Sequence, residues 1–417
     1  MEKKGWSGIN RRNVVVGLDV GTSSIKAVMA EVASPSAVNI LGLAHRPSAG
    51  LRKGNIIDIE ATARSIDGCL NELERLTGVE INSAVCGFSG ISINAVSNHA
   101  VIAVANPNYE ITEEDKRRVL QLAQNVALPP DKMIVQLIER QYIVDGYDGV
   151  KDPVGMVGSR LEVEVLIIIA AAAALQNLQR SAERINLYLE RFVYNPLLMA
   201  EAVLMPAEKE MGVALVDFGG GTTEISVFEQ GSLVSTSVLP IGGEYITKDL
   251  AIVLRTSIEE AARIKQEGGV AAAAMADSEV MMNVRNIQGN EVRQISQHVI
   301  ADIVAARIME IAEMIHAELT QTTYLEKLPG GLVLSGGGAQ LKGITEVLEA
   351  YLNIPVRLGM PDNIRGLQRE FNQAENAVVL GCIGYAAQKA APGLIDNNHR
   401  FASVFDRVSY WFKDLFG

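Results

Sequence analysis

The sequence contains few of the residues that form disulfides or bind transition metals. Three cysteines, Cys69, Cys86 and Cys382, occur among 417 residues, and their spacing matches neither a zinc site nor a redox motif. The five histidines are scattered and form no metal-binding or catalytic-triad pattern. We therefore expect no zinc or thiol chemistry, and we interpret the cysteines as apolar side chains of a protein in a reducing compartment.

The chain also lacks a basic surface of the kind that binds nucleic acid. Lysine and arginine total 37 against 49 aspartates and glutamates, which gives a formal net charge of -12. No dense run of lysine and arginine offsets this balance, so we predict that the body of the protein does not bind nucleic acid.

No apolar run is long enough to cross a membrane. The longest one, VLIIIAAAAAL at residues 165–175, predicts a buried strand that passes into a helix. The polar start MEKKGWSGINRR has no apolar core typical of a secretory signal, so we expect a cytoplasmic protein. With 48% hydrophobic residues, a chain of this length is expected to form two or three domains.

What the sequence does contain is the same turn motif twice, at residues 14–27 and 212–228. Each copy is an apolar strand, an aspartate, a glycine-containing turn with a threonine, and a second strand. Such a turn is common in ordinary hairpins, but its glycines and exposed N–H groups also suit a phosphate. Two copies half a chain apart suggest two related lobes that close on one ligand. The candidate phosphate-binding residues are Gly21, Thr22, Gly219, Gly220, Gly221 and Thr222.

The two aspartates of these motifs, Asp19 and Asp217, are candidates for a cation site between the lobes. Magnesium prefers oxygen ligands and is commonly bound by one or two carboxylates together with substrate phosphates. We therefore predict ATP and Mg²⁺ as cofactors. If hydrolysis occurs, it should depend on positioning and charge stabilisation by these residues rather than on a protein nucleophile.

A third glycine-rich element, at residues 330–343, predicts a buried strand, a turn and then a helical segment. Its turn, with Gly336 and Gly337, suits a flat base or a phosphate close to the backbone. In this order the three elements resemble the phosphate-1, phosphate-2 and adenosine motifs of the superfamily of actin, heat-shock chaperones and sugar kinases. The resemblance implies an α/β, two-lobed, actin-like ATPase fold built from duplicated ribonuclease-H-like domains.

Lys26 follows the first turn, and two interpretations of it are open. It could reach a phosphate, or it could be an outward charge at the end of a strand.

Two further segments narrow the resemblance. The sequences YIVDGYDGVKDPVGMVGSRLEVEV, at residues 142–165, and GGEYITKDLA, at residues 242–251, resemble the FtsA family of bacterial cell-division proteins. This resemblance implies an FtsA-type inserted subdomain and self-association into actin-like filaments. It also implies a location at the division septum, on the cytoplasmic face of the inner membrane.

The same resemblance implies a set of units along the chain. They are the first lobe with the phosphate-1 motif (12–84), the inserted subdomain (85–162), the continuation of the first lobe (163–205), the second lobe with the phosphate-2 motif (206–240), its small subdomain (241–329), the rest of the second lobe with the adenosine motif and a return helix (330–390), a linker (391–399) and an amphipathic helix (400–417).

The small subdomain is expected to form the nucleoside side of the cleft. Gly243 lies at a predicted helix start and is a candidate nucleotide-binding residue. In related proteins a glutamate and a lysine of this region approach the ribose, and Lys265 matches that lysine. The usual glutamate is Ala262, and Glu259 and Glu260 face other sides of a helix. Lys265 could equally be a solvated charge near the end of its helix.

The same subdomain is where the resemblance places the main partner, the C-terminal tail of the tubulin-like division protein FtsZ. Arg293 and Arg307 are candidate contacts for that acidic tail, although each could be a solvated helix charge. Downstream membrane proteins of the division machinery are further expected partners.

The carboxyl end predicts an amphipathic helix. Large apolar residues recur there at spacings of three and four, which places them on one helix face. In the resembling family this tail targets the membrane, and the alternative is a helix docked on its own core. The candidate membrane-binding residues are Phe401, Phe405, Val408, Trp411, Phe412, Leu415 and Phe416.

Two other functions remain open on the same fold. One is a scaffold of the pilus-assembly type, and the other is a small-molecule kinase. A kinase would need an additional carboxylate base beside an acceptor pocket, and the sequence offers no clear candidate.

Overall fold

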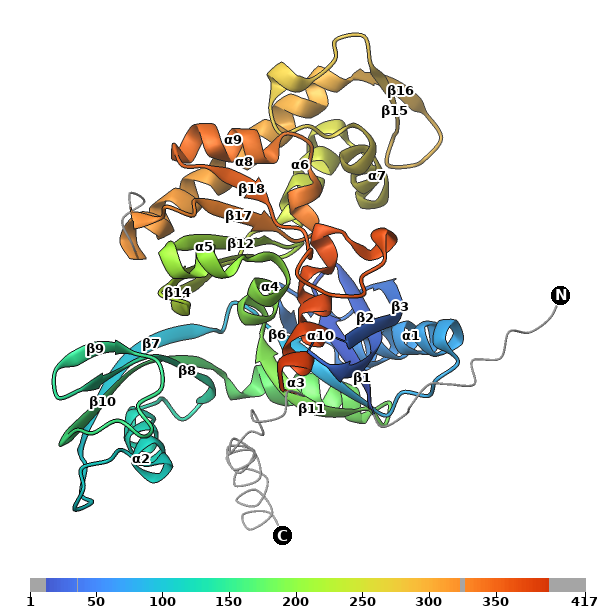
Figure 1. The fold of residues 1–417 in the computed structure, drawn as a ribbon. Coiled ribbons are helices and arrows are strands. Elements are labelled where there is room, and N and C mark those ends of the chain that lie inside the picture. The colour runs from blue at the N-terminus through green and yellow to red at the C-terminus, as the bar shows by residue number, and fades with distance from the viewer. Residues whose placement is uncertain (1–12, 36, 323–326, 390–417) are drawn as a thin grey trace.

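A computed structural model describes residues 13–35, 37–322 and 327–389. Its central feature is a pair of five-stranded sheets, one in each lobe, that lie one above the other (Figure 1). The sheet of the first lobe has the order β11-β6-β1-β2-β3. Its strands are β1 (Val14–Val20), β2 (Ser24–Ser34), β3 (Ala37–Pro47), β6 (Ser83–Phe88) and β11 (Tyr188–Tyr194).

The sheet of the second lobe repeats this topology. Its order is β14-β13-β12-β17-β18, so that β12, β13 and β14 form an antiparallel meander and β17 pairs with β12 in parallel, as β6 does with β1. The duplication predicted from the two turn motifs is therefore confirmed. The strands are β12 (Val213–Phe218), β13 (Thr223–Glu229), β14 (Ser232–Leu239), β17 (Leu332–Ser335) and β18 (Val356–Leu358).

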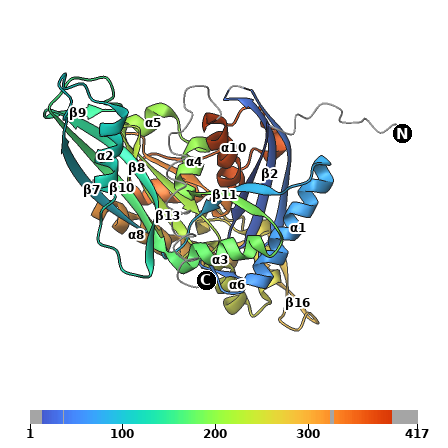
Figure 2. The ribbon, with the colours of Figure 1, turned by 90° about the horizontal axis from the view of Figure 1, so that it is seen from below.

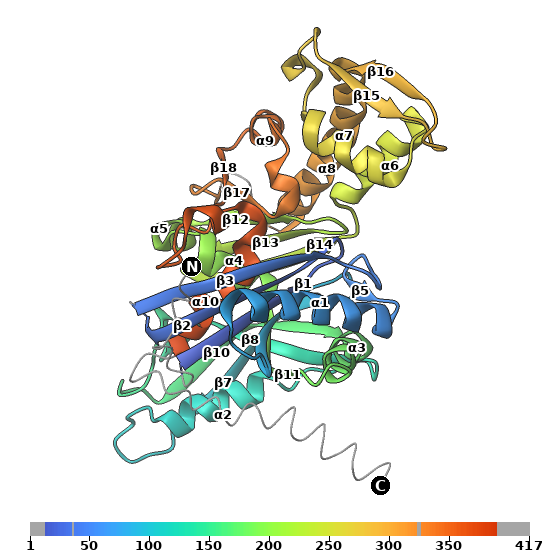
Figure 3. The same cartoon turned by 90° about the vertical axis from the view of Figure 1, so that its right-hand side faces the viewer.

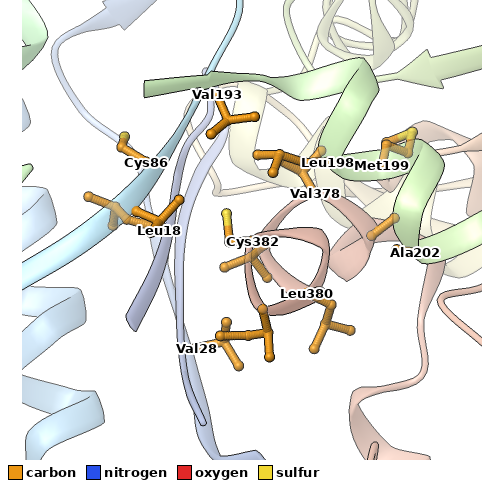
Figure 4. Packing of buried hydrophobic residues seen from close by; sticks show 14 of the residues in the cluster. Leu18, Val28, Cys86, Val193, Leu198, Met199, Ala202, Val378, Leu380 and Cys382 are labelled. Carbon is orange, nitrogen blue, oxygen red and sulfur yellow. The ribbon is translucent and has the colours of Figure 1, made fainter. Parts of the chain in front are cut away.

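Helix α10 (Ala377–Lys389) packs between the first sheet and helix α4 (Asn195–Val203). Figure 4 shows Val378 and Cys382 of α10 close to Leu198 of α4. Gly17 of β1 permits this approach, because a Cβ there would come within 2.7 Å of the Cys382 Cβ. All three cysteines are buried and free, as expected for apolar core residues.

Local sequence signals account for the helices that flank the first sheet. Helix α1 (Ile59–Thr77) begins after Asp58, whose side chain accepts a hydrogen bond from the Ala61 N–H. It ends at Gly78, which adopts the left-handed conformation with φ of 71°. The apolar run at 165–175 forms a buried strand that passes into a helix, as predicted. These two elements are β10 (Arg160–Ala171) and α3 (Ala172–Glu183).

The inserted subdomain is a separate four-stranded sheet with one covering helix, at the lower left of Figure 1 and on the left of Figure 2. Thr112 begins helix α2 with a capping box to Asp115, so the helix start predicted there is confirmed. The predicted boundary at residue 162 falls inside β10, which pairs along its length with β7 and β8. The elements are β7 (Asn94–Ala103), α2 (Glu113–Ala123), β8 (Lys132–Val144), β9 (Tyr147–Val150) and β10.

The small subdomain lies on the second lobe at the far end from the insert (Figure 3). It contains α6 (Gly243–Leu254), α7 (Ile258–Gly268), η2 (Ala273–Met275), β15 (Met281–Arg285), β16 (Val292–Ser296) and α8 (Gln297–Thr322). The remaining short elements are β4 (Leu51–Arg52), β5 (Asn55–Ile56), α5 (Pro206–Met211), η4 (Gly337–Gln340), α9 (Ile344–Leu352), η5 (Arg369–Phe371) and η6 (Ala374–Asn376).

The linker and the amphipathic helix predicted at 391–417 lie outside the described residues. Within the described residues, none of the helices has the length and hydropathy needed to pass through a lipid bilayer.

Candidate functional site between the two lobes

The two glycine-containing turns face each other across the boundary between the lobes. A Cβ on Gly220 would overlap the Ser23 hydroxyl, and one on Gly221 would lie 2.8 Å from Thr22 Oγ1. The turns are closed by equivalent backbone bonds, from the Gly21 N–H to the Ser24 carbonyl and from the Gly219 N–H to the Thr222 carbonyl. The structure thus brings together the six residues predicted to hold phosphates.

Asp19 and Asp217 lie near the carboxyl ends of the equivalent strands β1 and β12, directly before the two turns that meet between the lobes. Burial raises the pKa of both carboxyl groups, and for Asp217 burial and then the charge of Asp19 raise it to about 7. The two glycine turns that follow these strands are in contact, so the two carboxyl groups lie close enough for the charge of Asp19 to act on Asp217. Two neighbouring carboxylates repel each other when both are ionised, and a divalent cation bound between them would remove that repulsion.

Lys26 lies on β2, directly opposite Asp19 in the β1–β2 ladder. Lys26 is only 5% exposed, so the interpretation of this lysine as an outward charge at the end of a strand is wrong. The ammonium hydrogen-bonds to the Glu375 carbonyl, and its Nζ lies 3.6 Å from Glu375 Oε2. Its positive charge partly opposes the rise that burial causes in the pKa of both aspartates.

Glu224 adds a third buried carboxyl group. It lies on β13 opposite Asp217, is 4% exposed, and accepts a hydrogen bond from the Ser89 hydroxyl. Burial, followed by the charge of Asp217, raises its pKa well above the usual value. Its other oxygen, Oε2, is buried and has no hydrogen-bond partner among the described residues. A ligand or ion in the cleft would relieve that unsatisfied acceptor.

The third glycine turn lies beside this cluster. Gly336 has φ of 88°, and a Cβ there would overlap Asp217 Oδ1. At Gly337 a Cβ would have its nearest neighbour, the Glu375 Cβ, 3.9 Å away. The adenosine turn and the phosphate turns therefore border one continuous site, and only the first of the two glycines is sterically required.

We expect Gly336→Ala to lower the free energy of unfolding by about 1 to 3 kcal/mol, because the left-handed backbone and the Asp217 contact both oppose a methyl group. Gly337→Ala is the matched control and should change stability by less than about 0.5 kcal/mol. Urea denaturation of the two variants measures the difference. Equal midpoints would contradict the assigned packing of this turn.

The amino end of α6 closes the site on the side of the small subdomain. The Gly243 and Glu244 N–H groups donate to the carbonyls of Gly219 and Gly220, at 3.0 and 2.9 Å. The predicted site residue Gly243 therefore supports the second phosphate turn through its N–H group. Its carbonyl accepts a hydrogen bond from Lys265 Nζ at 3.0 Å.

Lysine 265 is not a freely solvated helix charge. Burial lowers the pKa of Lys265, and the charge of Glu244 opposes that shift. Ala262 stands one helical turn before Lys265, at the position where the sequence analysis expected a glutamate. Glu260 does not replace it, because Glu260 pairs with Arg263 at 2.7 Å and accepts from the Arg285 N–H at 3.0 Å.

Two more contacts join the lobes beside the glycine turns. The Ser23 hydroxyl donates to Glu244 Oε1 at 2.8 Å. Lys53, in the β4–β5 hairpin of the first lobe, has its Nζ 5.6 Å from the ring centroid of Tyr245 on α6. A hydrogen bond from Lys53 lowers the pKa of Tyr245. These contacts tie the first phosphate turn to the small subdomain.

The two predicted partner-binding arginines have different surroundings. Arg307 of α8 forms a two-pronged ion pair with Asp249, with distances of 2.6 and 2.9 Å, and its side chain is 21% exposed. Arg293 hydrogen-bonds to the Leu254 carbonyl at the end of α6, and its Nε is buried without a partner among the described residues. The structure does not bring these two arginines into the cleft.

The residues in the cleft fit a magnesium nucleotide. Among the described residues, no group of three or more histidine, cysteine, aspartate or glutamate side chains forms a metal site. Magnesium is commonly bound by one or two carboxylates together with substrate phosphates and water, and Asp19 and Asp217 are two such carboxylates.

Sequence reasoning missed Ser89 and Glu375. Ser89 follows β6, whose parallel pairing with β1 brings its carboxyl end next to Asp19, and the parallel-strand rule was a usable signal for it. Glu375 lies in η6 outside every motif, and we find no sequence signal that marks it.

Comparisons with known proteins agree with this geometry. The family model described as cell division protein FtsA matches residues 214–381, and the model described as the SHS2 domain inserted in FtsA matches residues 90–169. Cell division protein FtsA of Pseudomonas aeruginosa is 32% identical over 98% of this chain and 100% of its own length. The FtsA of Bacillus subtilis is 41% identical over 85% of this chain and 80% of its own.

Solved structures of lower identity share the fold. The PilM–PilN type IV pilus biogenesis complex has a TM-score of 0.63 at 17% identity and covers 90% of this chain and 98% of its own. MreB5 of Spiroplasma citri bound to ADP has a TM-score of 0.55 at 13% identity, with the same coverage. These neighbours confirm the actin-like fold, and the sequence relatives do not favour the pilus-assembly or kinase alternatives. The chain belongs to the FtsA family of actin-like cell division proteins.

Proposed function

We propose that the cleft binds ATP with Mg²⁺ between the lobes. Asp19 and Asp217 would hold the magnesium and its water, and the two glycine turns would bind the phosphates. Gly336, Gly337 and Lys265 would border the adenosine. The metal would supply positive charge that neutralises the phosphates. The observation that carries this proposal is the convergence of two aspartates, two phosphate turns and the adenosine turn on one cleft.

We further propose that the protein forms filaments on the cytoplasmic face of the membrane and links FtsZ to it. The family assignment supports this role, and the apolar face predicted at 400–417 supports a surface anchor. The protein would act at the division septum, where it would also help to recruit membrane proteins of the division machinery.

Co-sedimentation with FtsZ polymers tests the proposed partnership. We expect the full chain to pellet with intact FtsZ and not with FtsZ that lacks its C-terminal tail. Equal pelleting with both forms would contradict docking through the tail, and no pelleting with either would contradict the link itself.

Within the small subdomain, we expect Arg307→Ala to weaken binding of an FtsZ tail peptide by about tenfold, since a charge-assisted contact contributes about 1.5 kcal/mol or more. Arg307 is the better candidate because its side chain reaches the surface of α8, whereas Arg293 caps α6. Fluorescence anisotropy with a labelled peptide measures the change.

Arg263→Ala is the matched control for this prediction. Arg263 is an arginine of the same subdomain, 38% exposed and paired with Glu260 and Glu267. An equal loss in both variants would show a general charge effect instead of a contact at Arg307.

A further inference from the structure

The central sheet of the first lobe is incomplete at one end. Among the described residues, β1 and β6 pair in parallel at two positions, Gly17 with Val85 and Leu18 with Cys86. The residues of β1 that precede Gly17 have no partner on β6, although β6 itself pairs with β11 from its first residue onward. The two strands therefore separate at their first residues, at the end of the sheet remote from the glycine turns.

A cavity of about 230 Å³ lies at this end of the sheet. An apolar cavity of about 150 Å³ is large enough for benzene, so this one is large enough for a bicyclic aromatic side chain. Glu80 and Asn82 are exposed, and the cavity is therefore open to solvent at its polar rim. Its apolar wall consists of Val14, Val16, Val79 and Ile81.

The rim of this cavity is acidic. Glu80 lines it directly. Glu74 accepts a hydrogen bond from the Ile81 N–H at 2.7 Å, and Glu190 accepts one from the Ser83 hydroxyl. In the part of the chain that the structure describes, none of the three carboxylates forms an ion pair with a lysine or arginine. A basic segment would therefore meet uncompensated negative charge here.

The segment that precedes β1 has a composition that complements this surface. Residues 1–12 lie outside the described residues, and they are attached at the cavity, since Val14 is both the first residue of β1 and part of the wall. The segment has four basic residues against one acidic residue, Glu2. The basic residues are Lys3, Lys4, Arg11 and Arg12.

The same segment contains one large aromatic residue, Trp6. Between Trp6 and β1 lie Ser7, Gly8 and Asn10, which are residue types that favour a turn. A turn there would direct the chain before it back along the start of β1. Tryptophan combines a large apolar area with an N–H donor, which suits an apolar cavity that has carboxylate and amide acceptors at its rim.

We propose that residues 1–12 fold back over the first residues of β1 and β6, with the Trp6 indole in the cavity and the basic residues beside Glu74, Glu80 and Glu190. The segment is covalently attached next to the cavity, so its effective concentration there is high and no outside partner is required. The contact closes the incomplete end of the sheet and fastens the start of the strand that carries Asp19.

The chain contains two tryptophans, Trp6 and Trp411, so the full chain with Trp411→Phe reports on Trp6 alone. We expect its fluorescence to shift to shorter wavelength, and its quenching by acrylamide to be several-fold weaker than that of a peptide of residues 1–12. Glu80→Lys in this background should raise the quenching toward the peptide value, because it places a positive charge beside the basic segment. Equal quenching of the unsubstituted cavity and the peptide would overturn the inference.

Glu229→Lys is the matched control, since it makes the same change of charge at an exposed glutamate of the second lobe. It should leave the quenching unchanged, and an equal rise in both variants would show a general effect of charge and overturn the assigned contact. Weak quenching that depends on protein concentration would show that the segment of a second copy fills the cavity. That result would overturn the fold-back within one chain.

Thermal melting tests the cavity independently. Trp6→Ala should lower the Tm by about 2 to 4 °C, because the indole no longer fills the cavity. In Val79→Phe, whose added ring occupies the cavity, Trp6→Ala should have no further effect. If Val79→Phe does not fold, Glu80→Lys decides, because its exposed side chain is not part of the core. An equal loss of Tm from Trp6→Ala in both backgrounds would place the indole elsewhere and overturn the inference.

Discussion

Asp217→Asn is expected to weaken magnesium-dependent ATP binding by at least 100-fold, which is about 2.7 kcal/mol. The substitution keeps the shape of the side chain and removes one of the two carboxylates available to the cation. Isothermal titration calorimetry with ATP and Mg²⁺ measures the loss. Asp148→Asn, which changes an exposed carboxylate on β9 of the insert, should leave the affinity unchanged.

The same substitution should stabilise the protein in the absence of ligand. The pKa of Asp217 is raised from 3.8 to about 7, so the folded state holds its proton more tightly than the unfolded chain does. The stability linked to this group is therefore present below about pH 4 and is lost as the pH rises through about 7. At pH 8 we expect Asp217→Asn to gain on the order of 1 to 3 kcal/mol.

Denaturation between pH 5 and pH 8 without magnesium checks this dependence. The unmodified protein should lose stability over that window more steeply than Asp217→Asn does. Lower ligand-free stability of the variant, or unchanged affinity for magnesium nucleotide, would contradict the assignment of Asp217 to the buried cation site.

Removal of residues 400–417 is expected to abolish sedimentation with liposomes and to leave ATP affinity unchanged. Burial of one large apolar side chain contributes roughly 1.5 to 3 kcal/mol, so seven such residues supply on the order of 10 kcal/mol before the loss of conformational entropy. Charge contributes little, because Arg400, Arg407 and Lys413 are offset by Asp406 and Asp414. Sedimentation should therefore depend weakly on anionic lipid.

Trp411→Glu combined with Phe412→Glu supplies a control of full length. It should lose liposome binding as the deletion does, since it interrupts the apolar face without shortening the chain. Retained lipid binding in either variant would contradict the anchor. Loss of ATP binding together with lipid binding would instead favour a helix that packs on its own core.

Individual residues show how far sequence reasoning reached into the site. Asp19, Asp217 and the glycine turns were predictable because each belongs to a strand–turn–strand motif whose local geometry exposes the same groups. For Lys26 and Lys265 the sequence did not decide whether the side chain is buried at the site or exposed to solvent. Strand and helix periodicity place their Cα atoms, but they do not show which other segments cover the side chains.

Ser89 and Glu375 illustrate the limit more sharply. Ser89 meets Glu224 across 135 residues of sequence, and Glu375 meets Lys26 across 349. Neither residue lies in one of the three glycine-rich motifs, and the partner of each is brought close only by the folding of distant segments.

The amino-acid sequence by itself determined the repeated lobe, the order of the phosphate and adenosine elements and the family, because these follow from local patterns of apolar residues and glycine. The tertiary structure alone decided the charge balance of the site, where Lys26 is buried opposite Asp19 and pairs with Glu375. Electrostatic interactions depend on distance and burial, and these quantities exist only after the two lobes have packed together.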